Sequence, residues 1–393
     1  MRTSVVIISY RPGEWLVPCL TSVMDQADEV VLVDNGSEGA AASRLGEQTG
    51  ARVVRLPSNT GFAPAVNLAV AQCGGELIGL LNDDAIAGPG WLAAAAEALK
   101  DEAVAAVGAK VVLTTRYREV RFPDQEWFAP GDRRPLGRQL RSVTVDGDEL
   151  LDAAIGPGLY RAEGSAHSEN GRWRWTAGER PWYVPLPDAD PAAEVLVNGE
   201  PAPPGRVVRL VNSAGGFLDD RGYGGDIGAD TPDDGQFDEK ADRFAVSGSA
   251  FVTRKKTWAE LGPFAGRFFA YYEDVDWCWR AQLAGRRLVY DPTATVEHRR
   301  SASSGGEHRP WVRVMSERNR TLTMVRNGPG RLVVKALRDR LDNGPDGGVR
   351  AGIARLLPWA LASRARMERR WEAKAETVWE RWAGVDAAEP QHP

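Results

Sequence analysis

The chain has 393 residues, which at about 150 residues per domain predicts two or three domains, or one large α/β domain with additions. Apolar residues make up 43 % and charged residues 26 % of the chain, and these ordinary globular values exclude wholesale disorder, collagen and coiled coil. Lys and Arg together number 49 and Asp and Glu number 54, so the net charge of −5 argues against a uniformly basic nucleic-acid binder.

The cysteines and the apolar segments indicate the compartment. Cys19, Cys73 and Cys278 lie far apart and form no CxxC pair, which favours a reducing environment over a disulfide framework or a structural zinc site. The apolar run near the N-terminus is too short for a signal peptide, and no apolar window reaches the roughly 18 residues of a membrane span. We therefore expect a soluble, cytoplasmic protein.

The first 115 residues alternate between the patterns of buried strands and of amphipathic helices. A strong turn signal, Asp34-Asn35-Gly36-Ser37, closes the second predicted strand. Alternation at this spacing predicts a mainly parallel sheet flanked by helices. The predicted strands are 4–9, 29–33, 51–56 and 76–81, and the predicted helices are 12–24, 61–73 and 89–99.

The next stretch breaks this rhythm. Turn signals such as Asp146-Gly147 and Asn198-Gly199 crowd together, and short alternating runs at 142–145 and 194–197 suggest hairpins. We therefore expect a β-rich insertion, after which a strand over 244–252, a helix over 270–284 and a strand over 287–290 resume the α/β pattern. The expected organisation is a first half at 1–115, the insertion at 116–206, a second half at 207–325 and a helical C-terminal extension at 326–393.

The C-terminal extension is predicted to be helical over 353–382, with an apolar stripe of Met367, Trp371, Ala375, Val378, Trp379 and Trp382. Basic residues near its start would suit an anionic membrane surface. However, Glu368, Glu372, Glu376 and Glu380 recur every four residues and oppose that interpretation. We expect the stripe to pack on the protein or on a second subunit rather than on a membrane.

Polar clusters follow the predicted parallel strands, where open α/β sheets bind ligands. Ser9 and Tyr10 follow the first strand, and Asp34 follows the second, where its carboxylate could accept a hydrogen bond from a nucleobase. Asp83 and Asp84 follow the fourth strand and suit a hard divalent cation that keeps positions open for phosphate oxygens. A turn or helix cap explains this last pair about equally well.

A second acidic cluster lies in the segment FFAYYEDVDWCWR, where Glu273, Asp274 and Asp276 occupy four positions near a helix start. Acidic residues are common in first turns, and Asp276 could pair with Arg280 four residues later. The functional interpretation is a general base beside an aromatic platform for a sugar ring. Glu273 and Asp274 point in different helical directions, so we expect only one of them to face the cleft. The sequence alone does not decide whether His298 is a surface histidine or a metal ligand.

Taken together, the motifs resemble those of inverting glycosyltransferases of family 2, which have the GT-A fold, and most of all the rhamnosyltransferase-like bacterial members that build cell-surface polysaccharide. The matching order and spacing cover about 230 residues, in 1–115 and 207–325. The matching segments are VVIISYRPGEWLVPCLTSV, VVLVDNGS, NTGFAPAVNLAV, LLNDDA, VNSAGG, SGSAFVTRKKTWAELGPF, FFAYYEDVDWCWRAQLAG and TVEHRRSAS.

The resemblance implies nucleotide-sugar-binding roles in the first half. The residue at Asp34 contacts the nucleobase, and the segment from Ser9 to Arg11 lines the nucleotide. Asn82 replaces the first acid of the family's DxD metal motif, so Asp84 is the expected metal ligand and Asp83 the second choice. The other implied nucleotide-sugar contacts are Ser9, Tyr10, Arg11, Asn59, Gly61 and Asn67.

The resemblance also implies roles in the second half. Glu273-Asp274 matches an acidic pair whose second member is usually the base, so Asp274 is the expected base with Glu273 beside it. His298 matches a histidine that ligates the metal in some members, which favours the metal interpretation. The implied halves are nucleotide-sugar binding at 1–115 and acceptor and catalytic chemistry at 207–325.

The expected function is therefore metal-dependent inverting sugar transfer with Mg²⁺ or Mn²⁺. The expected donor is a dTDP-, UDP- or GDP-sugar, and the acceptor is a saccharide or a lipid-linked hydroxyl compound. No nucleic-acid partner is expected, whereas homo-oligomerisation or weak peripheral contact with the inner face of the cell membrane through the C-terminal helices stays open. A P-loop NTPase is excluded because GxxxxGK[ST] is absent, and a nucleotidyltransferase because 10–14 does not form its Gly-rich basic loop.

The main alternative is a non-catalytic protein that binds carbohydrate or nucleotide sugar. It would use the aromatic residues of the insertion as a binding surface, although such residues more often form a small hydrophobic core. These residues are Trp127, Trp173, Trp175, Trp182 and Tyr183.

Overall fold

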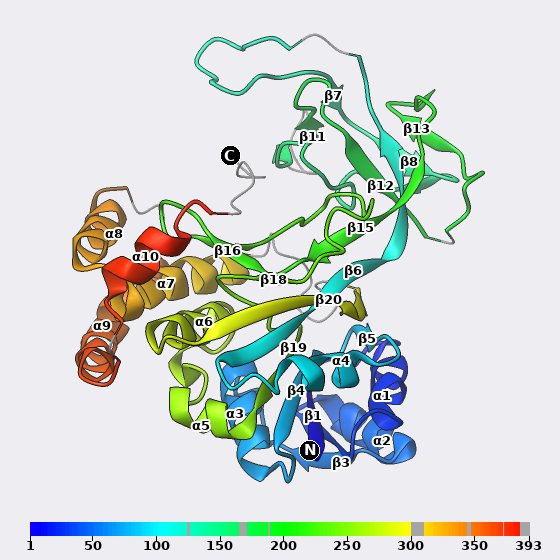
Figure 1. Cartoon of the computed structure of the whole chain (residues 1–393). Coiled ribbons are helices and arrows are strands. Elements are labelled where there is room, and N and C mark those ends of the chain that lie inside the picture. Colours follow the sequence, from blue (N-terminus) through cyan, green and yellow to red (C-terminus); the bar gives the residue numbers. More distant parts are fainter. Residues whose placement is uncertain are drawn as a thin grey trace. The chain divides into compact units, whose positions relative to one another are not determined.

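The computed structural model describes residues 1–123, 126–164, 171–187, 189–299, 310–343, 347–371 and 373–385 (Figure 1). The chain divides into two compact units. The second unit consists of Val112–Asn212 and Gly228–Gly235, and the first consists of Met1–Val111, Ser213–Ile227 and the chain from Gln236 to its C-terminal helices. Every candidate site residue lies in the first unit, so the candidate site belongs to that unit alone.

The N-terminal part of the first unit is the predicted parallel sheet. Its strands have the order β3-β2-β1-β4, and all three pairings are parallel. Alternate residues of β1 face opposite sides, because Val6 packs in the cluster that contains α3, and Val5 in the cluster that contains α1 and α4. The elements are β1 (Thr3–Ser9), α1 (Leu16–Met24), β2 (Glu29–Asp34), η1 (Glu38–Ala40), α2 (Ala41–Thr49), β3 (Arg52–Arg55), α3 (Phe62–Gln72), β4 (Leu77–Asn82) and α4 (Trp91–Ala98).

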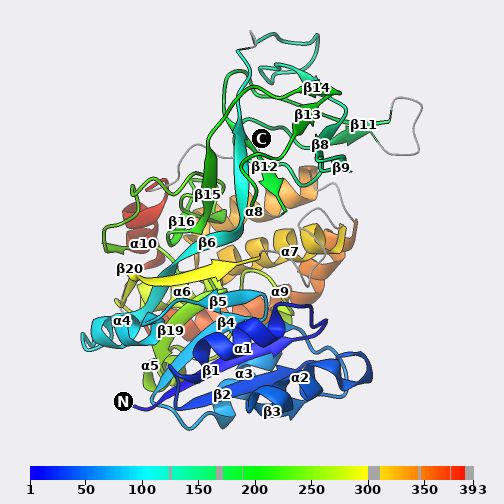
Figure 2. The same ribbon diagram turned by 90° about the vertical axis from the view of Figure 1, so that its right-hand side faces the viewer.

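The sheet continues beyond β4 in the order β4-β19-β6-β20-β18. In this part β19 is antiparallel to both β4 and β6, and β18 is antiparallel to β20. Figure 2 shows β20 in yellow beside β6. The short strand β5 pairs with the end of β20, so that His298 lies opposite Ala85. The elements are β5 (Ala85–Ala87), β6 (Val104–Val120), β16 (Gly216–Leu218), β17 (Gly224–Asp226), β18 (Ala241–Asp242), β19 (Ala250–Arg254), α5 (Lys255–Leu261), η2 (Gly266–Phe268), α6 (Glu273–Leu283) and β20 (Arg287–His298).

Three predicted boundaries in this region were wrong, and all three lie at the candidate site. The strand predicted over 244–252 begins only at Ala250, because the chain at 247–249 leaves the ladder for a loop. The helix predicted over 270–284 begins only at Glu273, because Phe269, Tyr271 and Tyr272 have left-handed φ angles of 70°, 71° and 68°. The last strand is longer than predicted and continues to His298.

The second unit is β-rich. Both predicted hairpins are present: β8 and β9 are joined by Asp146-Gly147, and β13 and β14 by Asn198-Gly199. All four turn residues have positive φ, as the tight hairpin turn requires. The elements are β7 (Gln139–Leu140), β8 (Val143–Val145), β9 (Asp148–Glu149), β10 (Glu163–Gly164), β11 (Arg172–Trp175), β12 (Trp182–Leu186), β13 (Val195–Val197), β14 (Glu200–Pro201) and β15 (Val207–Ser213).

The aromatic residues of the insertion divide into two groups. Trp182 and Tyr183 are buried in hydrophobic clusters, so they are core residues and cannot form a binding surface. Trp127 is 44 % exposed and its ring meets that of Trp175 edge-on, at 5.6 Å between centroids.

The C-terminal extension is helical, but the helix predicted over 353–382 is interrupted. Helix α9 ends at Glu368 and α10 begins at Ala375, so the predicted stripe does not lie on one helix. Trp379 stacks on Trp279, and Trp382 donates from Nε1 to Gln282 Oε1 at 3.1 Å. The elements are α7 (Pro310–Asn327), α8 (Gly330–Asn343), α9 (Gly347–Glu368) and α10 (Ala375–Trp382).

The apolar residues of α10 therefore pack on the chain's own α6, as expected of the stripe. Among the helices that the structure describes, none combines the length and the apolar character that a membrane span requires. All three cysteines are buried with free thiols.

Candidate active site at the carboxyl edge of the sheet

Asp34, the expected nucleobase contact, is fully buried at the end of β2. Its carboxylate accepts hydrogen bonds from the Ser37 amide (2.7 Å), the Ser43 hydroxyl (2.5 Å) and the Ser43 amide (3.1 Å). Burial by itself would raise the pKa of Asp34, but these bonds outweigh it and hold the pKa below the ordinary value. The ionised carboxylate thus fixes the loop between β2 and α2, and its contact with a base stays a prediction.

Asn35 is a site residue that sequence reasoning missed. Its Nδ2 donates to Asn59 Oδ1 at 3.1 Å and to the Gly61 carbonyl at 3.2 Å, and its Oδ1 accepts the Thr60 amide at 2.9 Å. It therefore ties the loop after β2 to the loop after β3. The turn motif that contains Asn35 was visible in the sequence, but its partners 24 to 26 residues later were not.

Gly61 and Asn67 both contact the segment that precedes α6. A Cβ at Gly61, where φ is +95°, would lie 2.6 Å from the Phe269 ring and carbonyl oxygen, so only glycine fits there. The amide of Asn67 exchanges two hydrogen bonds of 2.9 Å with the backbone of Phe264. The expected role of Asn67 beneath the sugar nucleotide stays a prediction, and its observed role is to join α3 to this segment.

The two expected metal ligands lie together although 214 residues separate them in the sequence. His298 Nε2 lies 3.0 Å from Asp84 Oδ1 and 3.4 Å from Asn82 Nδ2, because the end of β20 pairs with β5 directly after the Asn82–Asp84 turn. One carboxylate and one imidazole fit a divalent cation that takes its remaining ligands from phosphate and water. No group of three or more His, Cys, Asp or Glu side chains in the described chain is arranged to hold a metal by itself.

The other expected nucleotide-sugar contacts line the end of β1. Ser9 is fully buried, whereas Arg11 is exposed with its guanidinium 5.3 Å from the ring centre of Tyr10. Burial raises the pKa of Asp83 to about 7; the neighbouring Asp84 adds to the rise and the Ser9 hydroxyl opposes it. This carboxyl with its raised pKa lies next in the sequence to Asp84, one of the two expected metal ligands.

Asp276, the third acid of the second cluster, has a structural role. Its fully buried carboxylate accepts from Arg280 Nε at 3.1 Å and from Asn327 Nδ2 at 2.9 Å, and it lies 2.7 Å from Arg326 Nε. The pairing with Arg280 that the spacing predicted is therefore present. These bonds join α6 to α7.

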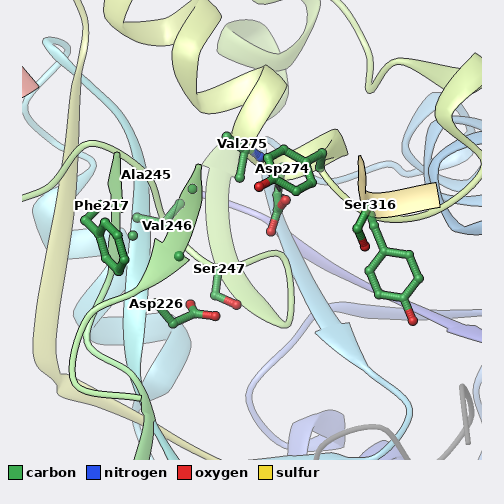
Figure 3. Close-up of a pocket in the computed structure, with 13 residues that line it drawn as sticks. Phe217, Asp226, Ala245, Val246, Ser247, Asp274, Val275 and Ser316 are labelled. Carbon is green, nitrogen blue, oxygen red and sulfur yellow. Dashed lines mark hydrogen bonds between the residues drawn. The ribbon is translucent and has the colours of Figure 1, made fainter. Parts of the chain in front are cut away.

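Asp274 lines a cavity of about 170 Å³, whereas Glu273 is buried outside its lining (Figure 3). Asp274 Oδ2 accepts the Gly248 amide and Oδ1 accepts the Val275 amide, both at 2.8 Å. Burial raises the pKa of Asp274 and the two amides oppose the rise. Burial and the Asp274 carboxylate raise the pKa of Glu273 well above its ordinary value. The cavity is lined by Gly216, Phe217, Gly224, Gly225, Asp226, Ala245, Val246, Ser247, Tyr271, Tyr272, Asp274, Val275 and Ser316.

A loop of three residues connects this cavity to the Asn82–Asp84 turn. The loop runs from Ser247, which lines the cavity, to Ser249, whose carbonyl accepts the Asn82 amide at 3.0 Å. Between them, Gly248 donates to Asp274. The loop therefore holds the candidate base and the candidate metal motif in one connected arrangement.

Comparison with known proteins finds similarity to glycosyltransferases. The model of the family described as "Glycosyl transferase family 2" matches residues 4–156, which include β1 to β6 and the Asn82–Asp84 turn. Residues 4–156 thus match a family 2 glycosyltransferase domain. It is similar to the N-acetylglucosaminyl-diphospho-decaprenol L-rhamnosyltransferase of Mycobacterium tuberculosis, in strains H37Rv and CDC 1551, at 26 % identity over 317 residues that cover 77 % of each protein.

Among solved structures, this glycosyltransferase is similar to GalNAc-T7, crystallised with UDP, GalNAc and Mn²⁺. The TM-score is 0.50 at 12 % identity, and the match covers 97 % of this chain but only 56 % of the solved one. At that identity the likeness shows the GT-A fold alone. The expected fold and enzyme class, a glycosyltransferase, are confirmed, and the non-catalytic alternative loses its support.

Proposed function

We propose that this glycosyltransferase moves a sugar from a nucleotide-diphospho-sugar to an acceptor hydroxyl with inversion, with the help of a divalent cation. The observation that carries the proposal is the placement of Asp274. Its carboxylate lines a cavity and is joined through the 247–249 loop to the Asn82, Asp84 and His298 cluster. A base on one side and a cation-binding pair on the other are what a direct displacement requires.

On the donor side, the loops after β1, β2 and β3 would bind the nucleotide. Asp84 and His298 would hold Mg²⁺ or Mn²⁺, which supplies positive charge beside the leaving diphosphate when bound. The side chain of Asn82 contacts His298, and the backbone amide of Asn82 donates to the Ser249 carbonyl of the 247–249 loop. Asp34 and Asn35 would support nucleotide binding indirectly, because their hydrogen bonds hold the loops after β2 and β3 in place.

On the acceptor side, Asp274 takes the proton of the attacking hydroxyl. The hydroxyl oxygen forms a bond to the anomeric carbon while the bond from that carbon to the diphosphate breaks, and the electron pair leaves with the nucleoside diphosphate. Attack from the face opposite the leaving group inverts the configuration. One carboxylate suffices for this step, and no covalent intermediate on the protein is formed.

The walls of the cavity suit a saccharide. The Phe217 ring lies over Gly225, where a Cβ would come within 2.6 Å of it, so the glycine leaves room for the ring. In Figure 3 this ring and the Asp274 carboxylate lie on opposite sides of the cavity, with Ser247 and Asp226 between them. An aromatic face with hydroxyl and carboxylate groups beside it can stack on a sugar ring and bind its hydroxyls.

The relative from M. tuberculosis is named as an L-rhamnosyltransferase that acts on an N-acetylglucosaminyl-diphospho-decaprenol. By similarity we propose an acceptor of the same class, a saccharide linked through diphosphate to a lipid, and a role in cell-surface polysaccharide or glycoconjugate synthesis. The donor would be a dTDP-, UDP- or GDP-sugar. A cytoplasmic location, homo-oligomerisation and peripheral contact with the inner membrane face stay predictions.

The test is a panel of nucleotide sugars, incubated with the full chain and with saccharide or lipid-linked acceptors, with and without Mn²⁺ or Mg²⁺. Release of nucleoside diphosphate that requires both the acceptor and the cation supports the proposal. Tight binding of a nucleotide sugar with no release under any of these conditions would instead support the non-catalytic alternative.

A further inference from the structure

The backbone in front of Asp274 has a conformation that its residues rarely adopt. Phe269, Tyr271 and Tyr272 all have φ near +70°, the left-handed region that favours glycine. Tyr272 occupies the cap position of α6, two residues before Asp274. Such a backbone persists only where surrounding groups hold it, so the contacts of this segment show what keeps the base in place.

Two buried side chains of α7 hold the segment by its carbonyl groups. Asn319 Nδ2 lies 3.1 Å from the carbonyl oxygen of Phe268, 2.9 Å from that of Ala270 and 2.8 Å from that of Tyr271. Arg318 donates to the Phe268 carbonyl at 2.7 Å and, from Nε, to Asn319 Oδ1 at 2.9 Å. Arg318 thereby fixes which way the Asn319 amide points.

The same segment contacts both halves of the site. On the donor side, the Phe269 carbonyl accepts the Ala63 amide at 3.1 Å, and its ring lies against Gly61. On the acceptor side, Tyr271 lines the cavity that contains Asp274. A change in the left-handed residues would therefore move the start of α6 and the Asp274 carboxylate relative to the Gly248 amide.

We propose that Asn319, oriented by Arg318, is a positioning residue: it holds the 268–272 segment, in which Phe269, Tyr271 and Tyr272 have positive φ, in the conformation that aims Asp274 into the cavity. This inference rests on the proposed function. Three converging carbonyls need hydrogen-bond donors, and these are the two N–H groups of Asn319 Nδ2 together with Arg318, which also donates to the Phe268 carbonyl. An aspartate of the same shape would bring carboxylate oxygens against carbonyl oxygens, and an alanine would remove the Asn319 donor from the Ala270 and Tyr271 carbonyls.

Helix α7 offers a matched control. Asn327 is an asparagine of the same helix, 1 % exposed where Asn319 is 0 % exposed, and it also bonds α6, through Asp276 (2.9 Å). Asn327→Ala removes a comparable buried amide without touching 268–272. If Asn319 only stabilises the fold, Asn319→Ala and Asn327→Ala should behave alike.

The experiment compares the full-length wild type with Asn319→Ala, Asn319→Ser, Asn319→Asp and Asn327→Ala, at a temperature well below every melting point. Readouts are kcat for transfer, KM for donor and acceptor, nucleoside diphosphate binding, and the hydrogen-exchange rate of the Gly248 amide. We expect Asn319→Ala to lower kcat at least about tenfold, since a misplacement of about 1 Å costs up to about a hundredfold. Nucleotide binding should stay within about twofold.

We also expect Asn319→Ala to speed exchange of the Gly248 amide, Asn319→Asp to be worse than Asn319→Ala, and Asn327→Ala to keep kcat and Gly248 exchange near wild type. The milder Asn319→Ser covers the case in which the other variants fail to fold. Equal loss of kcat in both alanine variants, or unchanged Gly248 exchange in Asn319→Ala, overturns the proposal. An inactive wild type contradicts the proposed function instead, and Gly248 exchange still decides the positioning role.

Discussion

The backbone amide of Gly248 donates a hydrogen bond of 2.8 Å to Oδ2 of Asp274, and a Cβ at Gly248 would lie 3.0 Å from the same oxygen. The absence of a side chain at this position allows the backbone to approach the carboxylate. A hydrogen bond of this kind favours the ionised form of the carboxyl, while burial disfavours it. The balance leaves the pKa of Asp274 raised, which sets the pH range in which it can act as a base.

The pH dependence of turnover follows from that raised pKa. A base acts in its ionised form, so kcat should fall as the pH drops through the pKa of Asp274, and this acid limb should lie above about 3.9, the ordinary value for aspartate. Gly248→Ala weakens the bond to the ionised form and should move the limb to still higher pH. Measurement of kcat from pH 4 to 8 in both proteins checks this, and a limb at the ordinary value in the wild type would contradict it.

The two members of the acidic pair should respond differently to amide substitution. Asp274→Asn should lower kcat at least about a hundredfold with nucleotide binding nearly intact, the scale of a lost general base. Glu273→Gln should keep kcat within about threefold, because burial and the Asp274 carboxylate raise the pKa of Glu273 and so favour the neutral form that glutamine imitates. Steady-state kinetics of the two variants and calorimetry with nucleoside diphosphate measure both effects.

Glu273→Gln should also stabilise the protein at neutral pH. The folded state keeps the Glu273 proton while the unfolded chain loses it above about pH 4.3, so this residue reduces stability as the pH rises toward its folded-state pKa. A higher melting temperature of Glu273→Gln at pH 7, and no difference at pH 4, is the expected result. Equal melting temperatures at pH 7, or a large loss of turnover in this variant alone, would reverse the assignment within the pair.

Asp84 and His298, the two candidate metal ligands, should control the metal-dependent binding of nucleoside diphosphate. Asp84→Ala and His298→Ala should each weaken that binding at least about tenfold, a loss that second-shell changes alone can produce. Asn82→Ala is the matched control and should weaken it less, because an amide is a poorer ligand than a carboxylate for a hard cation. Calorimetric titrations of UDP with and without Mn²⁺ measure the difference. Unchanged Mn²⁺ dependence in the Asp84 variant would eliminate this site.

Two substitutions on either side of one contact test the acceptor cavity. Phe217→Ala removes the aromatic wall, and Gly225→Ala places a Cβ within 2.6 Å of the same ring and displaces it. Each should raise the acceptor KM about tenfold, the equivalent of about 1.4 kcal/mol, and leave slow donor hydrolysis unchanged. Phe217→Tyr retains the ring and should behave like the wild type. A rise in donor KM instead would place the donor sugar in this cavity.

Local signals in the sequence were sufficient for the parts of the fold that local chemistry determines. The predicted strands and helices up to α4, the Asp146-Gly147 and Asn198-Gly199 turns and the Asp276–Arg280 pair depend on near neighbours in the sequence, and the structure contains all of them. Helix α2, in contrast, was not predicted. The pairing of His298 with Asp84 depends on β20 meeting β5 across 214 residues. The spacing of residues alone left the role of His298 undecided, and only the family resemblance favoured its interpretation as a metal ligand.

The residues that sequence reasoning missed act through backbone groups. Asn35 and Asn319 bind backbone carbonyls or amides of distant loops, and such partners leave no pattern of side-chain types. The late start of α6 was missed because aromatic residues rarely adopt left-handed φ and nothing local requires it at Phe269 or Tyr271. The α10 tryptophans pack on α6, and the helix breaks between α9 and α10. The periodicity of apolar residues does not predict such a break.

The measurement that tests the central claim most directly is the anomeric configuration of the product, determined by NMR after transfer from a donor of known configuration. Transfer by direct displacement, with Asp274 as the only base, predicts a linkage of the opposite configuration to the donor. A product that retains the donor configuration would contradict the assignment of Asp274 and the mechanism built on it.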